Sequence, residues 1–416
     1  MQYAVEHNHE VKRAELELDN YKSNKTGAIG RYLPKVDVAV GAQYNFGRTI
    51  DPETNLYTDV STFNNVYSLS ASLPVFDGFN RLHALKAAKA SVLMGLSALL
   101  QKQNRVALSA LQAFANVAYY EGLVKMAVEK VEESTLLLRQ TRLLEDVGRK
   151  SAADVAQVES QQAEADYELT RQQNLLASAV LELKKSMAYP IADTIRCEMP
   201  TLSAENSLDR DELLPSWEQN IPMLGMNPEL QASRFQLEAS KHEYRQARAA
   251  LYPSLSLNVG LSTNYFHTLH SDVGQSFSSQ FKNNLGEYVG ATLSIPLFNR
   301  LQTITSIRRA KNSYRIACEN YEQKQLELEK LAREAWQDWH GYLKQTVQMA
   351  KKVEADSIAY QLTRRQFEEG LATAIELRTT SVQLLKSKAT LLQCQLMAMV
   401  KKQLVRYYNG ETLWTE

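Results

Sequence analysis

The most constraining feature of this sequence is an internal repeat. Leu73-Pro74-Val75-Phe76-Asp77 in the first half is matched by Ile295-Pro296-Leu297-Phe298-Asn299 in the second, 222 residues further on. Gly148 and Gly370 are separated by the same 222 residues. Each half therefore repeats one order of elements, and the pattern predicts a helix, two strands, a long helix and a further helix in both halves.

The repeat divides the chain into four parts. These are a first repeat over residues 1–186, a linker or equatorial segment over 187–226, a second repeat over 227–408 and a C-terminal tail over 409–416. The linker contains four prolines, a density that favours a connector over a regular element: Pro190, Pro200, Pro215 and Pro222. The expected helices cover residues 5–30, 79–186 with a break at Gly148, 228–250, 301–369 and 373–408. The expected strands lie between residues 35 and 73 and over 254–262 and 287–295.

Two proline-free stretches are too long for the helices of an ordinary globular core. The stretch from Leu82 to Val147 spans roughly 100 Å as an α-helix, and the stretch from Gln302 to Glu369 spans about the same. Helices in globular proteins average about 11–12 residues. Apolar positions on these stretches mix with Ala and Gln. This mixture favours a wall of helices around a water-filled interior over the apolar seam of a two-stranded coiled coil. A plain coiled-coil rod is the alternative.

The predicted strands alternate between apolar and small polar residues. Val36, Val38 and Val40 share one face of the first strand, and Leu257 and Val259 share one face of the third. A tilted strand of about 9–11 residues can cross a bilayer, and a small polar face suits a water-filled lumen. For a single hairpin, a half-buried sheet in a soluble domain is the alternative. Aromatic residues near the loop ends fit a membrane-interface girdle: Tyr44, Phe46, Tyr67, Tyr265, Phe266 and Tyr288.

Four strands are too few to close a barrel. An open sheet in lipid would leave backbone groups without hydrogen-bond partners, which the membrane interior does not tolerate. A membrane interpretation therefore requires several copies of the chain. Three copies supply twelve strands, an even number within the range known for such barrels.

Composition argues against several other classes of protein. The 47 basic and 47 acidic residues balance, which argues against nucleic acid as the main partner. Cys197, Cys318 and Cys394 show no metal or redox spacing. His267 and His270 lie in a Ser- and Asn-rich stretch, and we expect no metal site there. No set of residues indicates a nucleophile, a general base or a phosphate loop, and we expect neither enzymatic activity nor a cofactor.

Two further absences concern the location of the protein. No run of 18 apolar residues marks a transmembrane helix. No signal peptide is visible at Met1. Taken literally, these two observations describe a cytoplasmic protein. The strands favour instead an exported protein whose leader has been removed.

With these motifs in place, the sequence resembles the TolC-type outer-membrane efflux family over nearly its whole length. The resemblance rests on the duplicated element order, on the strand-exit motifs at Pro74 and Phe76 and at Pro296 and Phe298, and on the turns Gly148-x-x-Ser151 and Gly370-x-x-Thr373. It implies a mainly α fold with a β-barrel portion. Three chains form a twelve-stranded transmembrane barrel, four strands from each, continued by a long periplasmic α-helical barrel.

The two turns contain the candidate site residues. Gly148 and Gly370 fit the left-handed position that ends a helix, and Ser151 and Thr373 are candidate N-caps, each followed three residues on by an acid. As capping-box acids, Asp154 and Glu376 have a structural role. The resemblance implies in addition that they line a periplasmic pore constriction. Phe367 and Ala372 stand where the family's tyrosine and arginine are expected, so the closed gate is expected to be held differently here.

The resemblance implies a passive exit duct of a tripartite efflux or type I secretion system for drugs, metals or proteins. The implied partners are two further copies in a homotrimer, a periplasmic adaptor protein, an inner-membrane transporter and outer-membrane lipid, without nucleic acid. The implied location is the bacterial outer membrane, with the helices in the periplasm. A soluble coiled-coil scaffold and a periplasmic adaptor are the alternatives, although residues 187–226 are too few for an adaptor's extra domains.

Overall fold

The structure of the protein is a computed structural model that describes residues 1–50, 55–59, 61–198, 221–269 and 275–414. Two compact units are present. The first unit combines Met1–Leu18, Gly95–Ser233 and Tyr321–Glu416, and the second combines Asp19–Met94 and Arg234–Asn320. Each unit thus contains segments from both halves of the sequence. The repeat boundaries at residues 186 and 227 stay predictions.

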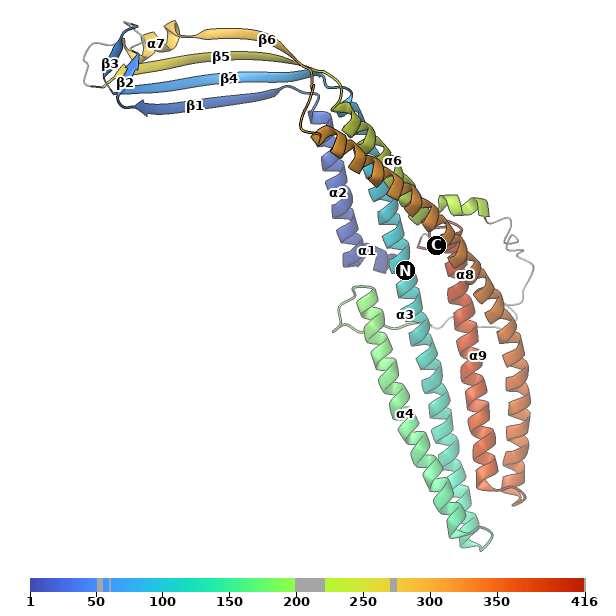
Figure 1. The fold of residues 1–416 in the computed structure, drawn as a ribbon. Coiled ribbons are helices and arrows are strands. Elements are labelled where there is room, and N and C mark those ends of the chain that lie inside the picture. Colours follow the sequence, from blue (N-terminus) through green and yellow to red (C-terminus); the bar gives the residue numbers. More distant parts are fainter. Residues whose placement is uncertain (51–54, 60, 199–220, 270–274, 415–416) are drawn as a thin grey trace. The chain divides into compact units, whose positions relative to one another are not determined.

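The first unit is built from long helices. They are most of α3 (Asn80–Asp146), α4 (Ala152–Ser186), most of α8 (Gln302–Glu368) and α9 (Ala374–Tyr408), and the short α1 (Gln2–His7) lies in the same unit (Figure 1). Both α3 and α8 contain 67 residues, which confirms the predicted pair of very long helices. Among the residues that the structure describes, the buried side chains of this unit form several small clusters between the helices.

An asparagine precedes a helix near the start of each half. The Asn8 side chain accepts the Glu10 N–H at 2.7 Å, and α2 (His9–Gly30) starts immediately after it. The Asn227 side chain accepts the Glu229 N–H at 2.9 Å before α6 (Pro228–Ala249). These bonds satisfy backbone donors that the first turn leaves free. They also explain why the helix predicted over residues 5–30 is divided at Asn8.

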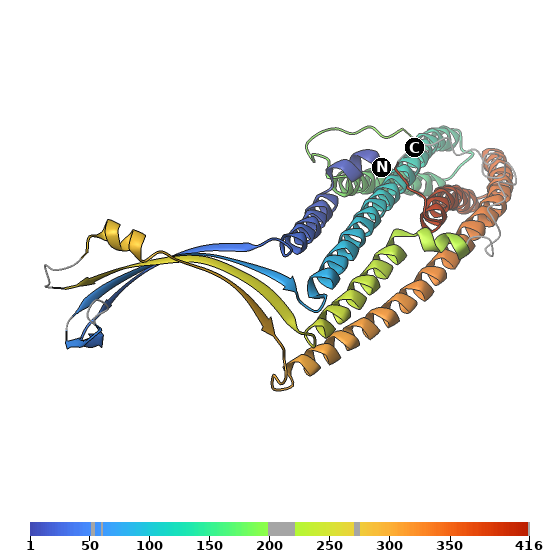
Figure 2. The same ribbon diagram turned by 90° about the horizontal axis from the view of Figure 1, so that it is seen from above.

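The second unit contains a four-stranded antiparallel sheet in the order β1 (Lys35–Asn45), β4 (Thr62–Phe76), β5 (Ser254–Thr268) and β6 (Gly286–Ser294) (Figure 1). Figure 2 shows the twist of these strands. One apolar row crosses all four strands, from Val36 through Ala71 and Val259 to Val289. The adjacent row, on the other face, contains Asp37, Ser70, Gly260 and Tyr288. The register therefore places the alternating apolar residues predicted for the strands on one face of the sheet. Two of the aromatic residues predicted for the interface girdle, Phe266 and Tyr288, share the register of Gly260 and lie on the other face.

Several elements differ from the prediction. β4 and β5 each contain 15 residues, and β4 continues through Pro74 to Phe76. A register shift between Pro74 and Phe76 accommodates the proline, since a bulge needs no N–H from that residue. Three short elements were not predicted: β2 (Arg48–Ile50), β3 (Tyr57–Asp59) and α7 (Phe277–Asn283). They lie in loops whose composition gives no clear periodicity.

Part of the predicted linker is visible. Residues 191–198 follow α4 without a regular element, and the buried Lys184 side chain holds them by donating to the Ile191 and Asp193 carbonyls at 2.9 and 2.6 Å. A short helical turn, η1 (Ile221–Met226), ends the segment. Pro200 and Pro215 lie outside the described residues. Among the helices of the described part of the chain, none is long and apolar enough to cross a bilayer.

Candidate pore constriction at the helix hairpins

The two helix hairpins of the first unit turn in the same way. In the first, Gly148 has a φ of +73°, and the Arg149 N–H donates to the Leu144 carbonyl at 2.8 Å. In the second, Gly370 has a φ of +79°, and the Leu371 N–H donates to the Gln366 carbonyl at 2.7 Å. A residue with a left-handed backbone suits glycine, which has no Cβ to clash. The repeated glycines therefore end α3 and α8 in the same way.

Each turn is followed by a capping box. Ser151 Oγ accepts the Asp154 N–H at 3.2 Å, and Asp154 Oδ2 accepts the Ser151 N–H at 3.0 Å. At the start of α9, Thr373 Oγ1 accepts the Glu376 N–H at 3.2 Å, and Glu376 Oε2 accepts the Thr373 N–H at 2.8 Å. Both carboxylates thus have the structural role foreseen from the spacing.

The same hydrogen bonds keep both acids charged. The Ser151 backbone and hydroxyl donate to Asp154 and lower the pKa of its carboxyl. Thr373 does the same for the pKa of Glu376. In the single chain the Glu376 side chain is exposed and that of Asp154 is half-buried. Capping and a fixed negative charge are therefore compatible at these two positions.

A buried phenylalanine packs the two hairpins against each other. Phe367 is only 2% exposed and packs in one cluster with Leu138, Val158 and Leu377, which come from α3, α4 and α9. The Lys150 ammonium lies 4.0 Å from the centre of the Phe367 ring, within the range of a cation–π contact. Phe367 is thus a core residue here, and Ala372 packs at the edge of the same cluster.

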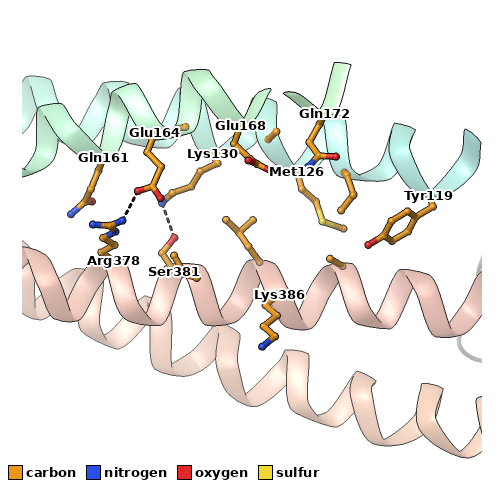
Figure 3. A pocket seen from close by; sticks show the side chains of 16 residues that line it. Tyr119, Met126, Lys130, Gln161, Glu164, Glu168, Gln172, Arg378, Ser381 and Lys386 are labelled. Atoms are coloured by element: carbon orange, nitrogen blue, oxygen red, sulfur yellow. Dashed lines mark hydrogen bonds and ion pairs between the residues drawn. The ribbon is translucent and has the colours of Figure 1, made fainter. Parts of the chain in front are cut away.

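Polar contacts join α4 to α9 further along the hairpins. Arg378 pairs with Glu164 at 2.7 Å, and the buried Gln161 side chain donates to the Ala374 carbonyl at 3.2 Å. Lys130 of α3 donates to Ser381 Oγ at 2.7 Å (Figure 3). These side chains line a cavity of about 410 Å³ between α3, α4 and α9. Sequence reasoning missed all of these contacts, because no local spacing relates partners more than 200 residues apart.

The two strand-exit motifs have the same sequence pattern but different surroundings. In the first, Asp77 pairs with Arg81 at 2.9 Å, and the Phe76 and Phe79 rings lie 5.4 Å apart. In the second, Pro296 follows the end of β6 by two residues, and Phe298 is 78% exposed. The exposed phenylalanine indicates that the second motif lacks a covering partner within the single chain.

The described residues contain no group of three or more His, Cys, Asp or Glu that could hold a metal ion. His267 lies on β5, where its ring stacks 6.4 Å from that of Tyr265. His270 lies outside the described residues. The three cysteines are free.

Comparison with known proteins agrees with this geometry. The model of the family described as outer membrane efflux protein matches residues 1–188 and 223–402. The toluene efflux pump outer membrane protein TtgC of Pseudomonas putida is 26% identical over 336 residues, which are 77% of this chain and 63% of the relative. The antibiotic efflux pump outer membrane protein ArpC of the same species has the same identity and coverage. The chain thus spans less than two thirds of the length of these curated relatives.

Solved structures share the fold at low sequence identity. The structure of CusC superposes with a TM-score of 0.85 at 16% identity, covering 98% of this chain and 90% of CusC. VceC from Vibrio cholerae gives 0.85 at 15% identity, covering 98% of this chain and 94% of VceC. The resemblance noted from the sequence is confirmed, as is the mainly α fold with a β portion.

Proposed function

The chain belongs to the outer membrane efflux protein family, and from this premise we propose that it is one subunit of an outer-membrane exit channel. In this role the sheet spans the outer membrane and the helices form a periplasmic tunnel. The observation that carries the proposal is the open, two-faced sheet, which has unpaired edges and an exposed apolar face. The proposed role is passive and needs no catalytic group.

The edges of the sheet support an oligomer. β1 and β6 are the outer strands of the sheet, and no other described strand pairs with the outer edge of either. On the apolar face Val38 is 73% exposed and Val289 74% exposed. Lipid would cover such a face, but free edges cannot remain in lipid. We propose that β6 of one chain pairs with β1 of the next and that three chains close a twelve-stranded barrel.

Exposed apolar side chains on the helices of the first unit fit the same assembly. Tyr167 on α4 is 68% exposed, and Leu326 and Ile358 on α8 are 69% and 63% exposed. Apolar faces on two different helices suit head-to-tail contacts between copies, which close into a ring. A homotrimer would cover both faces without leaving a free end.

The partners and cargo follow from the proposed role. An exit duct needs an inner-membrane transporter to drive export and a periplasmic adaptor to join the two. The curated relatives include an antibiotic pump protein and a toluene pump protein. These names support small organic compounds as the class of cargo.

We place the narrow periplasmic end of the channel at the helix hairpins. Asp154 and Glu376 occupy equivalent positions in two turns of the same geometry, and hydrogen bonds keep both ionised. Three copies would form rings of negative charge, which favour cations and oppose anions. Gly148, Ser151, Gly370 and Thr373 would fix the position of these rings by setting the turns.

Planar-bilayer recording tests the proposed function. The purified protein added to a bilayer should produce discrete conductance steps with cation preference. A scaffold or an adaptor would produce none. Absence of any channel activity from protein that is extracted as an oligomer from outer membranes would contradict the proposal.

A further inference from the structure

β5 is longer than the strand beside it. β6 pairs with β5 only from Ser254 to Ser262, whereas β5 continues to Thr268. No described strand pairs with this last part of β5 on the β6 side. Helix α7 packs there instead, at the loop end of the sheet (Figure 1).

A glutamine side chain of α7 makes hydrogen bonds to β5 that a neighbouring strand would otherwise make. Gln280 is only 7% exposed, and its side-chain oxygen accepts the Phe266 N–H at 2.9 Å. Its side-chain nitrogen donates to the Phe266 carbonyl at 2.9 Å and to the Gln275 carbonyl at 3.1 Å. The side-chain amide thus makes the pair of bonds that a backbone peptide would make in a β-ladder.

Two more side chains fix α7 to the same edge. Thr263 Oγ1 donates to the Phe281 carbonyl at 2.8 Å, and the Asn284 side chain donates to the Asn264 carbonyl at 2.9 Å. Several backbone groups that a lipid environment could not satisfy are therefore bonded within the chain. The helix is held in one orientation relative to the sheet.

That orientation places two phenylalanines on the apolar face. Tyr67 and Tyr265 project from the same face as Leu69 and Val259. The Phe277 ring lies 5.3 Å from Tyr265, and the Phe281 ring lies 5.4 Å from Tyr67. Phe277 and Phe281 remain 47% and 38% exposed. The apolar face of the sheet thus continues onto α7.

We infer that α7 is a membrane-interface anchor whose Phe277 and Phe281 rings contact phospholipid at the boundary between headgroups and acyl chains. This inference rests on the proposed function, which puts the apolar face of the sheet in lipid. Aromatic rings at the loop ends of strands are favoured at that depth, because one part of their surroundings is apolar and the other is wet. The remaining exposed positions of α7 are polar and fit the aqueous side of the interface: Ser278, Lys282 and Asn283.

Lipid fits this surface better than a second copy of the chain does. The exposed rings continue the face that carries Val36, Val38 and Val289, and this face points away from the lumen in a closed barrel. A neighbouring chain would approach along the strand edge, where Gln280 already occupies the backbone groups of Phe266. If α7 contacted a neighbouring subunit instead, its rings would be shielded from lipid, and the quenching experiment below would show this.

Tryptophan fluorescence in bilayers tests the inference. Full-length Phe277→Trp, Val259→Trp and Ser68→Trp would each be reconstituted in phosphatidylcholine vesicles, with bromine placed on the acyl chain either near the headgroup or near its end. The signal of the unsubstituted protein is subtracted in each lipid. The Val259 variant reports the lipid-facing side of the sheet, and the Ser68 variant reports the opposite, polar side.

We expect the added Phe277→Trp fluorescence to be lost mainly in lipid brominated near the headgroup. Val259→Trp should be quenched more by the deeper bromine, and Ser68→Trp by neither. Quenching of Val259→Trp without any quenching of Phe277→Trp would overturn the anchor while leaving the membrane-spanning sheet intact. Quenching of neither variant would contradict the proposed function itself.

A second variant tests the role of Gln280. Gln280→Glu has the same size and can still accept the Phe266 N–H, but its carboxylate cannot donate to the Phe266 and Gln275 carbonyls. In the Phe277→Trp background this change should release α7 and shift quenching away from the headgroup region. Quenching of Val259→Trp should stay unchanged. An unaltered Phe277→Trp profile would show that these bonds do not position the helix.

Discussion

At the residue scale, the hairpin acids illustrate how one side chain can serve structure and charge together. Asp154 and Glu376 each accept the N–H of their N-cap residue, and these bonds stabilise the ionised form. The capping box could be predicted from spacing alone, because its partners are three residues apart. The Arg378–Glu164 pair could not, because nothing in the sequence relates two residues on different helices of different halves.

Removing both charges should change the channel without changing its assembly. In Asp154→Asn with Glu376→Gln, the amides can still fill the capping boxes, so the helices should keep their starts. We expect weaker cation selectivity and weaker block by multivalent cations in planar-bilayer recordings. Unchanged selectivity of the double variant would leave these residues as structural caps only.

The lowered pKa values set the pH at which this selectivity disappears. A carboxyl whose pKa is depressed in the folded state stays charged through the pH range where ordinary Asp and Glu protonate, about pH 4. The ionised carboxyl stabilises the folded protein at pH values above that range. This stabilisation is lost as the pH falls through the pKa that the carboxyl has in the folded state. Cation selectivity should therefore persist at pH 5 to 6 (about one unit or more above that range) and fall only in stronger acid. Loss of selectivity near neutral pH would implicate other groups.

At the element scale, the sequence predicted which residues share a face of each strand more accurately than it predicted where the strands end. The alternation in β1, β4, β5 and β6 identified the correct side for Val36, Val259 and Val289. The extra length of β4 and β5 was missed, because polar residues such as Asn64 and Asn264 continue the pairing without a clear pattern. α7 was missed because a seven-residue helix in a polar loop has too few apolar positions to show a period.

A charged side chain should destabilise the inserted protein more on the apolar face of the sheet than on the polar face. Val38→Arg and Val259→Arg near the bilayer midplane should each destabilise the inserted protein by roughly 2–4 kcal/mol. Ser70→Arg on the polar face should cost less, because water can solvate it. Gly260 is unsuitable as the polar-face control, since an added Cβ would lie 2.5 Å from the Tyr288 ring. Denaturant unfolding in lipid vesicles measures the difference, and equal costs would argue against a membrane-facing side.

The turn from β4 into α3 depends on a close backbone approach. Gly78 has a φ of +65°, and a Cβ at this position would lie 2.6 Å from the Ala249 carbonyl oxygen. Gly148 has a φ of +73° with open space around it. Gly148→Ala should cost about 1–2 kcal/mol through backbone strain alone, and Gly78→Ala should cost more. Thermal unfolding of the two variants makes the comparison, and equal shifts in Tm would contradict the close packing at Gly78.

At the scale of the whole molecule, the two compact units have different requirements for partners. The sheet has an exposed apolar face and two outer edges with which no other described strand pairs, and the helices α4 and α8 carry exposed apolar side chains. The duplicated motifs predicted the element order and the family from sequence. Neither motif nor period could reveal the polar contacts around the 410 Å³ cavity, because these depend on how distant helices pack.

Native mass spectrometry of the detergent-extracted protein counts the chains in each complex and thereby tests whether three chains complete one barrel. The four strands of each chain cannot close a barrel alone, so we expect a single dominant species with three times the mass of the chain. Matched samples extracted in two different detergents control for dissociation. A stable monomer or dimer with an intact sheet in both detergents would rule out the trimeric barrel.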